Sequence, residues 1–410
     1  RQRQMCIRDR YYLQVLIGGL VLIAVTVPLS DNYKQIKVKN IFFAILMMFV
    51  FAFILLNDFV NNFFEALSNG VAKLSSATAE GTSFLFGSLF EAHPYIFALN
   101  VLPLIIVMSC ISALLWHWRV LPLIIKGLSY VCERLFNLGG PVSFGAAANV
   151  FVGQVEAPLF VRPYLKTMSN KELLILMTAG MATVSGSVMI ALAGQLENQF
   201  EGLNVVQHFL TASILSVPAA IMYAEIMSPS ADITHNLKSS EEKNIYQGSM
   251  DAITRGTRDG LSIAVNVAAI VLAVLALVSI VDGFLSIFGD ISLQKILGYI
   301  FAPICWLMGV PWNESANAAE LLGIKLATNE FVAYIQFGSL DPEYFTERTK
   351  VILLYALCGF ANFSSVGILI SGIGAMAPER RIDLIKVSGK ALIGATLASC
   401  MSGLVAGIFV

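Results

Sequence analysis

Charged side chains are scarce in this chain of 410 residues, because Asp, Glu, Lys and Arg together make up only 13% of it. Soluble domains carry about 25% charged residues, so this chain has roughly half of the usual surface charge. Hydrophobic residues make up 57%, and the mean hydropathy is +0.76. So few charges cannot cover a water-soluble protein of this size. Lipid must therefore be the solvent for most of the surface.

Cysteine, histidine and net charge are also low. The six cysteines are scattered with no Cys-x-x-Cys pair, which argues against a disulfide framework or a zinc site. The net charge of −1, without a basic stripe interleaved with aromatics, gives no case for nucleic acid as a partner. We expect the four histidines (His93, His117, His208 and His235) to be interfacial or solvated, not a proton relay. No G-x-S-x-G or H-E-x-x-H motif indicates an intramembrane enzyme.

Long apolar runs, in contrast, are abundant. A run of about 20 apolar residues crosses the hydrocarbon core of a membrane as a helix. Such runs occur at Tyr12–Val27, Ile41–Leu56, Tyr95–Leu115, Phe209–Met227, Leu261–Val281, Val351–Ile370 and Ala391–Val410. A further run, Leu173–Ala193, is interrupted by glycine and serine. The sequence therefore predicts an all-α polytopic membrane protein with about eight spanning helices.

The connections between these runs carry less regular patterns. Arg119–Phe136 mixes large apolar residues with charges, which is typical of a helix lying in the membrane interface, and Ile296–Val310 has a similar length. We interpret Asp58–Glu91 and Ser228–Asp259 as polar connections. Positive charge in the connections places both termini outside when the spans are counted in order. The Arg-rich residues 1–10 contradict that orientation and do not look like a signal peptide, so no role is assigned to them.

Two regions of the sequence resemble one another. The first contains NVFVGQVEAP (Asn149–Pro158) and then GMATVSGSV (Gly180–Val188), and the second contains KLATNEFVAY (Lys325–Tyr334) and then GFANFSSVG (Gly359–Gly367). In each, a Glu preceded closely by an amide comes before a Ser-containing Gly-x-Ala run, and the charge pattern sets the units in opposite orientations. Inverted repeats with broken helices indicate the binding site of a secondary transporter. Chance similarity of short Gly/Ala-rich strings is the alternative.

Glu156 and Glu330 lie in segments that break before they could cross a membrane. A carboxylate at the membrane centre costs roughly 2.5–3.5 kcal/mol or more. Irregular backbone at that depth occurs only where it is buried in protein or lines a cavity. We therefore predict two re-entrant hairpins whose tips bind a hydroxylated ligand or a cation. The alternative is a structural role, in which these carboxylates pair with Arg162 or Lys325.

At these residues the sequence resembles the concentrative nucleoside transporters. The matching strings, in order, are GQVEAPLFVRPYL (Gly153–Leu165), NEFVAY (Asn329–Tyr334), GFANFSSVGILISGIGAMAPERR (Gly359–Arg381) and KALIGATLA (Lys390–Ala398). The resemblance to a bacterial, eight-span member implies a homotrimer in the plasma (inner) membrane. It also implies a fixed scaffold and a mobile transport domain. The implied division is residues 1–136 (scaffold and interfacial helix), 137–228 (first hairpin, broken helix and following span), 229–310 (loop, scaffold span and interfacial helix) and 311–410 (second hairpin, broken helix and last span).

The resemblance implies a symporter that takes purine and pyrimidine nucleosides, of the uridine, cytidine or adenosine type, into the cell. Gln154 and Glu156 would bind the base edge, because an amide beside a carboxylate offers both donor and acceptor. The other implied substrate-binding residues are Glu330, Asn362 and Ser365 at the ribose hydroxyls, Phe360 against the sugar, and Asn329, Val155 and Val188. Val155 stands where many members have Thr or Ser, which puts the base preference in doubt.

The resemblance also implies sodium as the coupling ion, without an organic cofactor. Its ligands would be the Asn149 and Ser187 side chains and the Val152 and Val184 carbonyls, all hard oxygens. Asn149 could instead cap a helix, and Ser187 could bond to the carbonyl one turn earlier. A proton-coupled symporter is the main alternative function. A channel is a weaker one, because it would need a continuous polar lining.

Similar alternatives apply at the ribose side. Asn362 and Ser365 could form interhelical contacts instead of binding substrate, since such polar residues hold membrane helices together. Phe360 could be an ordinary packing residue.

Overall fold

The computed structural model describes residues 2–57, 60–87, 89, 96–196, 200, 203–230, 246–289 and 291–410, and these ranges contain helices and no strand. The α-helices are α1 (Gln2–Ala24), α2 (Val38–Leu55), α3 (Asn61–Phe86), α5 (Phe97–Asn100), α6 (Leu102–His117), α7 (Val120–Phe136), α8 (Gly140–Ala148), α9 (Glu156–Phe160), α10 (Asn170–Ala182), α11 (Gly186–Leu196), α12 (Val205–Met227), α13 (Ser249–Leu285), α14 (Leu293–Leu307), α15 (Trp312–Ala327), α16 (Glu330–Ser339), α17 (Glu347–Leu357), α18 (Phe363–Met376) and α19 (Arg381–Ala406). Short 3₁₀ helices are η1 (Val27–Leu29), η2 (Tyr33–Gln35), η4 (Arg162–Tyr164), η6 (Ser286–Phe288) and η7 (Pro378–Arg380).

Six helices within the described ranges are long and apolar enough to cross a membrane. They are Tyr11–Leu29, Val38–Leu55, Ala98–His117, Val205–Met227, Ser249–Phe288 and Pro378–Ala406. Each corresponds to an apolar run of the sequence. The two remaining predicted spans, Leu173–Ala193 and Val351–Ile370, are each split into two shorter helices, α10–α11 and α17–α18. The all-α membrane architecture is therefore confirmed.

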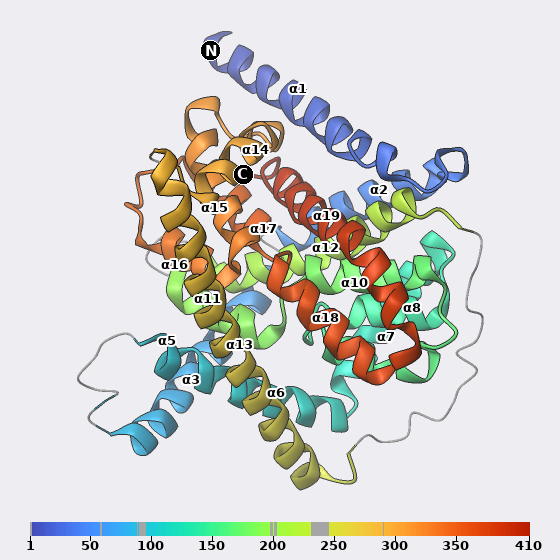
Figure 1. Ribbon diagram of the computed structural model, residues 1–410, viewed down its shortest axis with the longest axis vertical. Coiled ribbons are helices and arrows are strands. Elements are labelled where there is room, and N and C mark those ends of the chain that lie inside the picture. Colours follow the sequence, from blue (N-terminus) through green and yellow to red (C-terminus); the bar gives the residue numbers. More distant parts are fainter. Residues whose placement is uncertain are drawn as a thin grey trace.

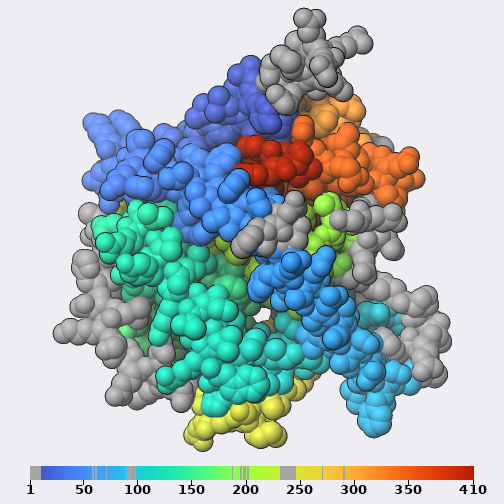
Figure 2. Space-filling model, turned by 180° about the vertical axis from the view of Figure 1, so that it is seen from behind, coloured from blue at the N-terminus to red at the C-terminus, as the bar shows by residue number. Residues whose placement is uncertain are grey.

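The helices divide into a buried group and a peripheral group. The most apolar stretch of α12 is 89% buried and that of α19 is 72% buried, whereas the most apolar stretch of α13 is only 12% buried. α10 and α17 pack on α12 and α19 to complete the buried group. Figure 1 shows the long helix α13 running along the outside of the bundle, and α13 lies along α6. Seen from behind in Figure 2, the N-terminal helices (blue) cover much of that face, and the C-terminal helix (red) appears only as a small patch.

The buried group contains the same sequence of elements twice. A helical hairpin (α8–α9), a broken helix (α10–α11) and a long helix (α12) are followed later by a second hairpin (α15–α16), a second broken helix (α17–α18) and α19. The two long helices pack against each other, and the hydroxyls of Ser216 and Ser402 lie 3.1 Å apart across that contact. Small residues and hydroxyls at helix contacts are the usual means by which membrane helices approach closely. The repeat seen in the sequence is thus a repeat of structure.

Helix caps decide where the broken helices begin and end. α10 starts with a capping box, in which Ser169 and Glu172 satisfy each other's backbone N–H groups. It ends at Ala182, because Thr183 takes an extended conformation. In the second repeat, α17 ends at Leu357, and Asn362 caps the N-terminus of α18 by accepting from the Ser365 N–H. Local side-chain chemistry therefore creates both breaks.

Two expectations about connections were wrong. Most of Asp58–Glu91 forms the helix α3, although part of that segment lies outside the described residues. The polar connection Ser228–Asp259 gives way to helix at Ser249, where α13 begins. Hydropathy alone gives Val351–Ile370 as one span, but the structure breaks it into α17 and α18, in line with the broken helix that the resemblance implies within 311–410. The helices expected at Arg119–Phe136 and Ile296–Val310 are present as α7 and α14.

Candidate functional site

The second hairpin brings a carboxylate to the start of its second arm. Glu330 is the first residue of α16 and is 4% exposed, and Asn329 caps the helix by accepting from the Val332 N–H at 3.0 Å. The amide nitrogen of Asn362 donates to Glu330 Oε2 at 2.9 Å. Asn362 therefore joins the N-termini of α16 and α18, and its oxygen caps the latter. Both helix dipoles point their positive ends to this place.

Ser365 lies beside these groups. It is 3% exposed and sits in the first turn of α18. A buried hydroxyl, a carboxylate and two helix N-termini together offer donors and acceptors for a ligand rich in hydroxyl groups. The interhelical role expected as the alternative for Asn362 is present, because both of its amide atoms make contacts within the protein.

The tip of the first hairpin leaves buried amide oxygens without partners. Asn149 is the C-cap of α8, and its nitrogen donates to the Gly145 carbonyl at 2.8 Å. Its oxygen Oδ1 is buried and has no hydrogen-bond partner among the described residues, and the same holds for Gln154 Oε1. A buried acceptor without a donor is costly, and its position indicates a bound ligand. The structure thus provides acceptor oxygens where the sequence led us to expect a cation and a base.

Glu156 occupies the place in the first hairpin that Glu330 occupies in the second. It is the first residue of α9 and is half-buried, and its Oε2 accepts from the Gly153 N–H at 2.9 Å. Each repeat therefore sets a carboxylate at the N-terminus of its hairpin's second arm. This equivalence of Glu156 and Glu330 confirms the pairing of the two Glu motifs within the repeat.

Glycine positions hold the first hairpin against the first helix break. A Cβ built on Gly180 would lie 3.3 Å from both Asn149 Oδ1 and Gln154 Cβ. The N–H of Gly186 donates to the Phe151 carbonyl at 3.2 Å. The hairpin tip therefore rests directly on the α10–α11 break.

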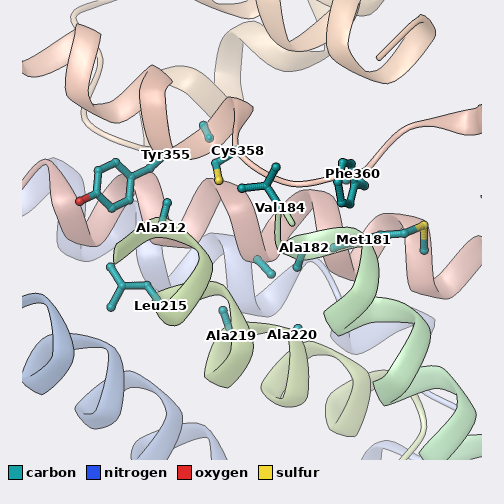
Figure 3. Packing of buried hydrophobic residues seen from close by; sticks show 14 of the residues in the cluster. Met181, Ala182, Val184, Ala212, Leu215, Ala219, Ala220, Tyr355, Cys358 and Phe360 are labelled. Carbon is teal, nitrogen blue, oxygen red and sulfur yellow. The ribbon is translucent and has the colours of Figure 1, made fainter. Parts of the chain in front are cut away.

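The two helix breaks also touch each other. Gly359 has a φ of 103°, and a Cβ on it would lie 2.5 Å from the Ala182 carbonyl oxygen. The Phe360 N–H donates to the Thr183 carbonyl at 3.3 Å. Figure 3 shows Ala182 and Val184 of the first break beside Cys358 and Phe360 of the second. Contacts thus run without interruption from the first hairpin, through both breaks, to Asn362 and Glu330.

The apolar and carbonyl positions expected at the site are placed as follows. Val155 packs toward Gly372 of α18, since a Cβ on that glycine would meet Val155 Cγ1 at 2.7 Å. Val188 and Val152 are buried, and Phe360 is 9% exposed. The hydroxyl of Ser213 on α12 lies 3.4 Å from the carbonyl oxygen of Val184.

The side chain of Ser187 lies outside the described residues, so its expected role stays a prediction. The cavities do not coincide with the hairpin tips. A cavity of about 220 Å³ lies elsewhere, lined by Lys37, Lys171 and Glu225 among others, and one of about 210 Å³ is lined by α1, α2 and α19. We place the candidate site by its convergent polar groups and not by these voids, because neither cavity is lined by residues of the hairpin tips or of the breaks.

Lys325 is a buried cation next to this site. It lies in the last turn of α15 and is 3% exposed. Its ammonium donates to the carbonyls of Ala356 and Cys358, at 3.0 and 3.3 Å. Lys325 and Glu330, considered above as a pair, therefore have separate hydrogen-bond partners. The lysine donates to main-chain carbonyls, and Glu330 accepts from Asn362.

One expectation about the histidines was wrong. His208 is not solvated, because it is 7% exposed and its Nδ1 lies 3.0 Å from the Tyr355 hydroxyl. Trp116 of α6 stacks on Phe160 of the first hairpin with ring centroids 3.6 Å apart. His93 and His235 lie outside the described residues.

Comparison with known proteins decides the family. The profile described as "Na+ dependent nucleoside transporter C-terminus" matches residues 208–407, its N-terminal counterpart matches 17–89, and "Nucleoside recognition" matches 98–199. The nucleoside permease NupC of Helicobacter pylori is 32% identical over 96% of this chain and 97% of its own length. The chain belongs to the concentrative nucleoside transporter family. Solute carrier family 28 member 3 of Homo sapiens is 32% identical over 96% of this chain and 59% of its own.

Solved structures of this transporter family have the same fold. CNTnw in an inward-facing substrate-bound state is 33% identical and has a TM-score of 0.88, covering 97% of this chain and 98% of that one. An outward-facing variant of CNTnw is similar at a TM-score of 0.87. This nucleoside transporter is therefore a multi-pass membrane protein and not an enzyme, as the sequence predicted.

Sequence reasoning missed several residues that shape the transporter's site. The sequence does not mark Ser213 of α12 or Gly372 of α18 as site positions, and only a three-dimensional contact shows that they face Val184 and Val155. Gly180 and Gly359 stood inside the repeated motifs. Their place at the start of each Gly-x-Ala run was the signal that could have marked them as close-contact positions.

Proposed function

We propose that this transporter is a sodium-coupled symporter that carries purine and pyrimidine nucleosides into the cell. The observation that carries the proposal is the buried amide oxygen of Asn149 at the first hairpin, which has no hydrogen-bond partner in the part of the chain that the structure describes and is joined by contacts to the Glu330–Asn362 pair of the second. A site with a free hard oxygen on one side and hydroxyl-binding groups on the other suits a cation and a sugar together. The family description "Na+ dependent" supports sodium as the cation.

The nucleoside would bind between the two hairpins. Gln154, whose Oε1 lacks a partner, would accept from an exocyclic amine or ring N–H, while Glu156 would bind the opposite part of the base edge. Glu330 and Ser365 would bind the ribose hydroxyls, and Phe360 would pack on the sugar. Asn362 and Asn329 hold the two helix N-termini in place as caps, so their contribution includes orienting the helices.

Val155 and Val188 would form the apolar surface beside the base. Because Val155 offers no hydroxyl, discrimination between bases depends on Gln154 and Glu156 alone. This supports broad acceptance of purines and pyrimidines.

Sodium would bind between the first hairpin and the α10–α11 break. The donor set is Asn149 Oδ1 with the Val152 and Val184 carbonyls and the Ser187 hydroxyl. Sodium binding would order the hairpin and offset the negative charge of the carboxylates, which raises nucleoside affinity. By linkage, the nucleoside raises sodium affinity by the same factor.

Transport would proceed by elevator-type movement of the two repeats as one body. The dense packing of α10, α12, α17 and α19 supports this, because closely packed helices move together. The peripheral helices α6 and α13 would belong to the scaffold. Exposed apolar residues on α13, such as Leu272 (75%) and Ile280 (69%), face lipid or the neighbouring protomers of a homotrimer.

Uptake of radiolabelled uridine and adenosine into proteoliposomes tests the proposal. We expect an inward sodium gradient to drive accumulation of both nucleosides, and a potassium gradient of equal size to drive none. A pH gradient that drives uptake without sodium would instead identify a proton-coupled symporter. Saturation of uptake excludes the channel alternative.

A further inference from the structure

Lys325 presents an unusual charge for its position. Its ammonium is almost fully buried in the second hairpin, and the partners that the structure gives it are two main-chain carbonyls, those of Ala356 and Cys358. Burying an ammonium is costly unless its donors are satisfied. A buried lysine that binds main-chain carbonyls calls for an explanation beyond packing.

These carbonyls belong to the C-terminal end of the half-helix α17, which stops at Leu357. The last carbonyls of a helix have no partners within the helix, and the helix dipole gives them a partial negative charge. In transporters with broken helices, such carbonyl ends coordinate cations. The ammonium of Lys325 therefore occupies the kind of position that a sodium ion takes.

The first repeat holds a neutral residue at the corresponding place. Asn149, the C-cap of α8, lies against Gly180 near the end of α10, and the ammonium of Lys325, in the last turn of α15, lies against the end of α17. Among the described residues, the Asn149 oxygen has no hydrogen-bond partner, whereas Lys325 places a positive charge whose donors are engaged. At this place the first repeat would need a cation from outside, and the second repeat already holds one.

We propose that the Lys325 ammonium is a built-in cation that fills the second repeat's counterpart of the sodium site, so that each protomer couples transport to one sodium ion. The same charge acts electrostatically on Glu330 of the same hairpin, and in this proposal that attraction orients the carboxylate toward the ribose. The inference rests on the proposed function, because it takes the first repeat's site to bind sodium. Lys325 is a positioning residue and does not itself contact the nucleoside.

Two substitutions of Lys325 distinguish the effect of its positive charge from the effect of the volume that its side chain fills. Lys325→Ala removes the ammonium and leaves a carbonyl-lined void, in which a sodium ion with water can bind. Lys325→Met removes the charge but fills the void with an apolar side chain of similar length. Lys350→Ala serves as a control, since Lys350 is also buried but its ammonium pairs with Glu347 at 2.6 Å on the same helix.

The measurement is sodium titration of thermal stability and of uridine affinity in detergent, at constant ionic strength with choline. The wild type and Lys350→Ala should show one sodium ion per protomer, with a Hill coefficient near one. In Lys325→Ala, a second sodium-dependent phase should appear, and uridine affinity should recover at high sodium. In Lys325→Met, uridine affinity should fall about tenfold at every sodium concentration, with no second phase.

The inference is overturned if the wild type already binds two sodium ions per protomer, or if the Ala and Met variants have the same sodium dependence. The wild-type stoichiometry decides the matter if neither variant can be purified. A wild type indifferent to sodium would refute the proposed function alone. In that case, sodium dependence acquired by Lys325→Ala would support the built-in cation, and its absence would overturn it.

Discussion

In the proposed cycle, the amide oxygen of Asn149 is the atom that receives sodium. The amide nitrogen of the same side chain donates to the Gly145 carbonyl. This hydrogen bond fixes the side chain, so that its oxygen faces the α10–α11 break. A side chain anchored at one end and unsatisfied at the other is prepared for a ligand. In the proposed cycle, sodium would bind to this oxygen without displacing the Asn149 side chain.

Substituting Asn149→Ala should abolish sodium-dependent stabilisation. The lost hydrogen bond to Gly145 lowers stability in all salts by about 1 kcal/mol. The decisive quantity is the increment in Tm between choline and sodium, because a ligand that binds only the folded state stabilises it by mass action. We expect this increment in the wild type and none in the variant, measured by differential scanning fluorimetry. An undiminished increment would show that sodium binds elsewhere.

Substituting Glu330→Gln should weaken nucleoside binding. The amide can still accept from Asn362, so the hairpin contact is kept while the charge is lost. Hydrogen bonds to charged groups contribute roughly 1.5–3 kcal/mol, so we expect the Kd for uridine to rise by about 10- to 150-fold in calorimetry. Glu343→Gln removes an exposed carboxylate of the same segment and should leave the Kd unchanged. Equal affinities in both variants would remove Glu330 from the site.

At the residue scale, the sequence could name the polar groups but not all of their partners. Asn329, Glu330 and Asn362 stood out because carboxylates and amides are rare in apolar surroundings. Lys325 was visible too, yet its contact with the carbonyls of α17 could not be predicted, because helix ends carry no side-chain pattern that shows what lies opposite. Ser213 was missed for the same reason.

At the scale of elements, the contact between the two broken helices depends on Gly359. A methyl group there would collide with the Ala182 carbonyl, and the φ of 103° is unfavourable for any other residue. Strained backbone of this kind costs on the order of 1–3 kcal/mol, and the collision adds to it.

Gly359→Ala should therefore lower the melting temperature markedly and reduce the yield of monodisperse protein. Gly367→Ala, in the middle of α18, is the matched control, since nothing lies within 4 Å of its added Cβ. It should be neutral or stabilise by at most about 1 kcal/mol through helix propensity. Fluorescence-detected size-exclusion chromatography after heating compares the two. Equal behaviour would mean that the breaks can separate freely.

Hydropathy predicted the helices that face lipid. It failed for a helix that contains polar residues and for a helix break set by backbone conformation. The helix α3 was missed because its polar residues, such as Asn69 and Lys73, lower the hydropathy of an otherwise regular helix. Hydropathy did not show the break in Val351–Ile370, because Cys358, Phe360 and Ala361 are apolar and hydropathy does not record a positive φ, so only the family resemblance implied a broken helix there. The glycine- and serine-rich break of the first repeat, in contrast, was visible in the sequence.

For the whole molecule, elevator-type movement requires contacts that exist in one state and not in another. The stack of Trp116 on Phe160 joins α6 of the proposed scaffold to the first hairpin. A covalent link at this position would prevent the hairpin from leaving α6. Binding of nucleoside in detergent does not require that movement, whereas uptake does.

Accordingly, Trp116→Cys with Phe160→Cys, in a background without other cysteines, should lose uptake after treatment with a short thiol cross-linker. Uridine binding in detergent should persist within about threefold, since the linked residues lie outside the proposed binding groups. Each single cysteine variant serves as a control for modification alone. Continued uptake by fully cross-linked protein would exclude relative movement of α6 and the first hairpin.

The missing Cβ at Gly359 has a consequence for how the ion and the sugar communicate. The backbone of Gly359 contacts the backbone of Ala182 there, with no side chain between them. The distance between the first and the second repeat is therefore fixed at this point. When sodium binds to the first repeat, the second repeat cannot respond by moving away. Sodium must then raise nucleoside affinity through its electric field and by restricting local motion. This effect should persist in a crystal, where the lattice prevents large displacements.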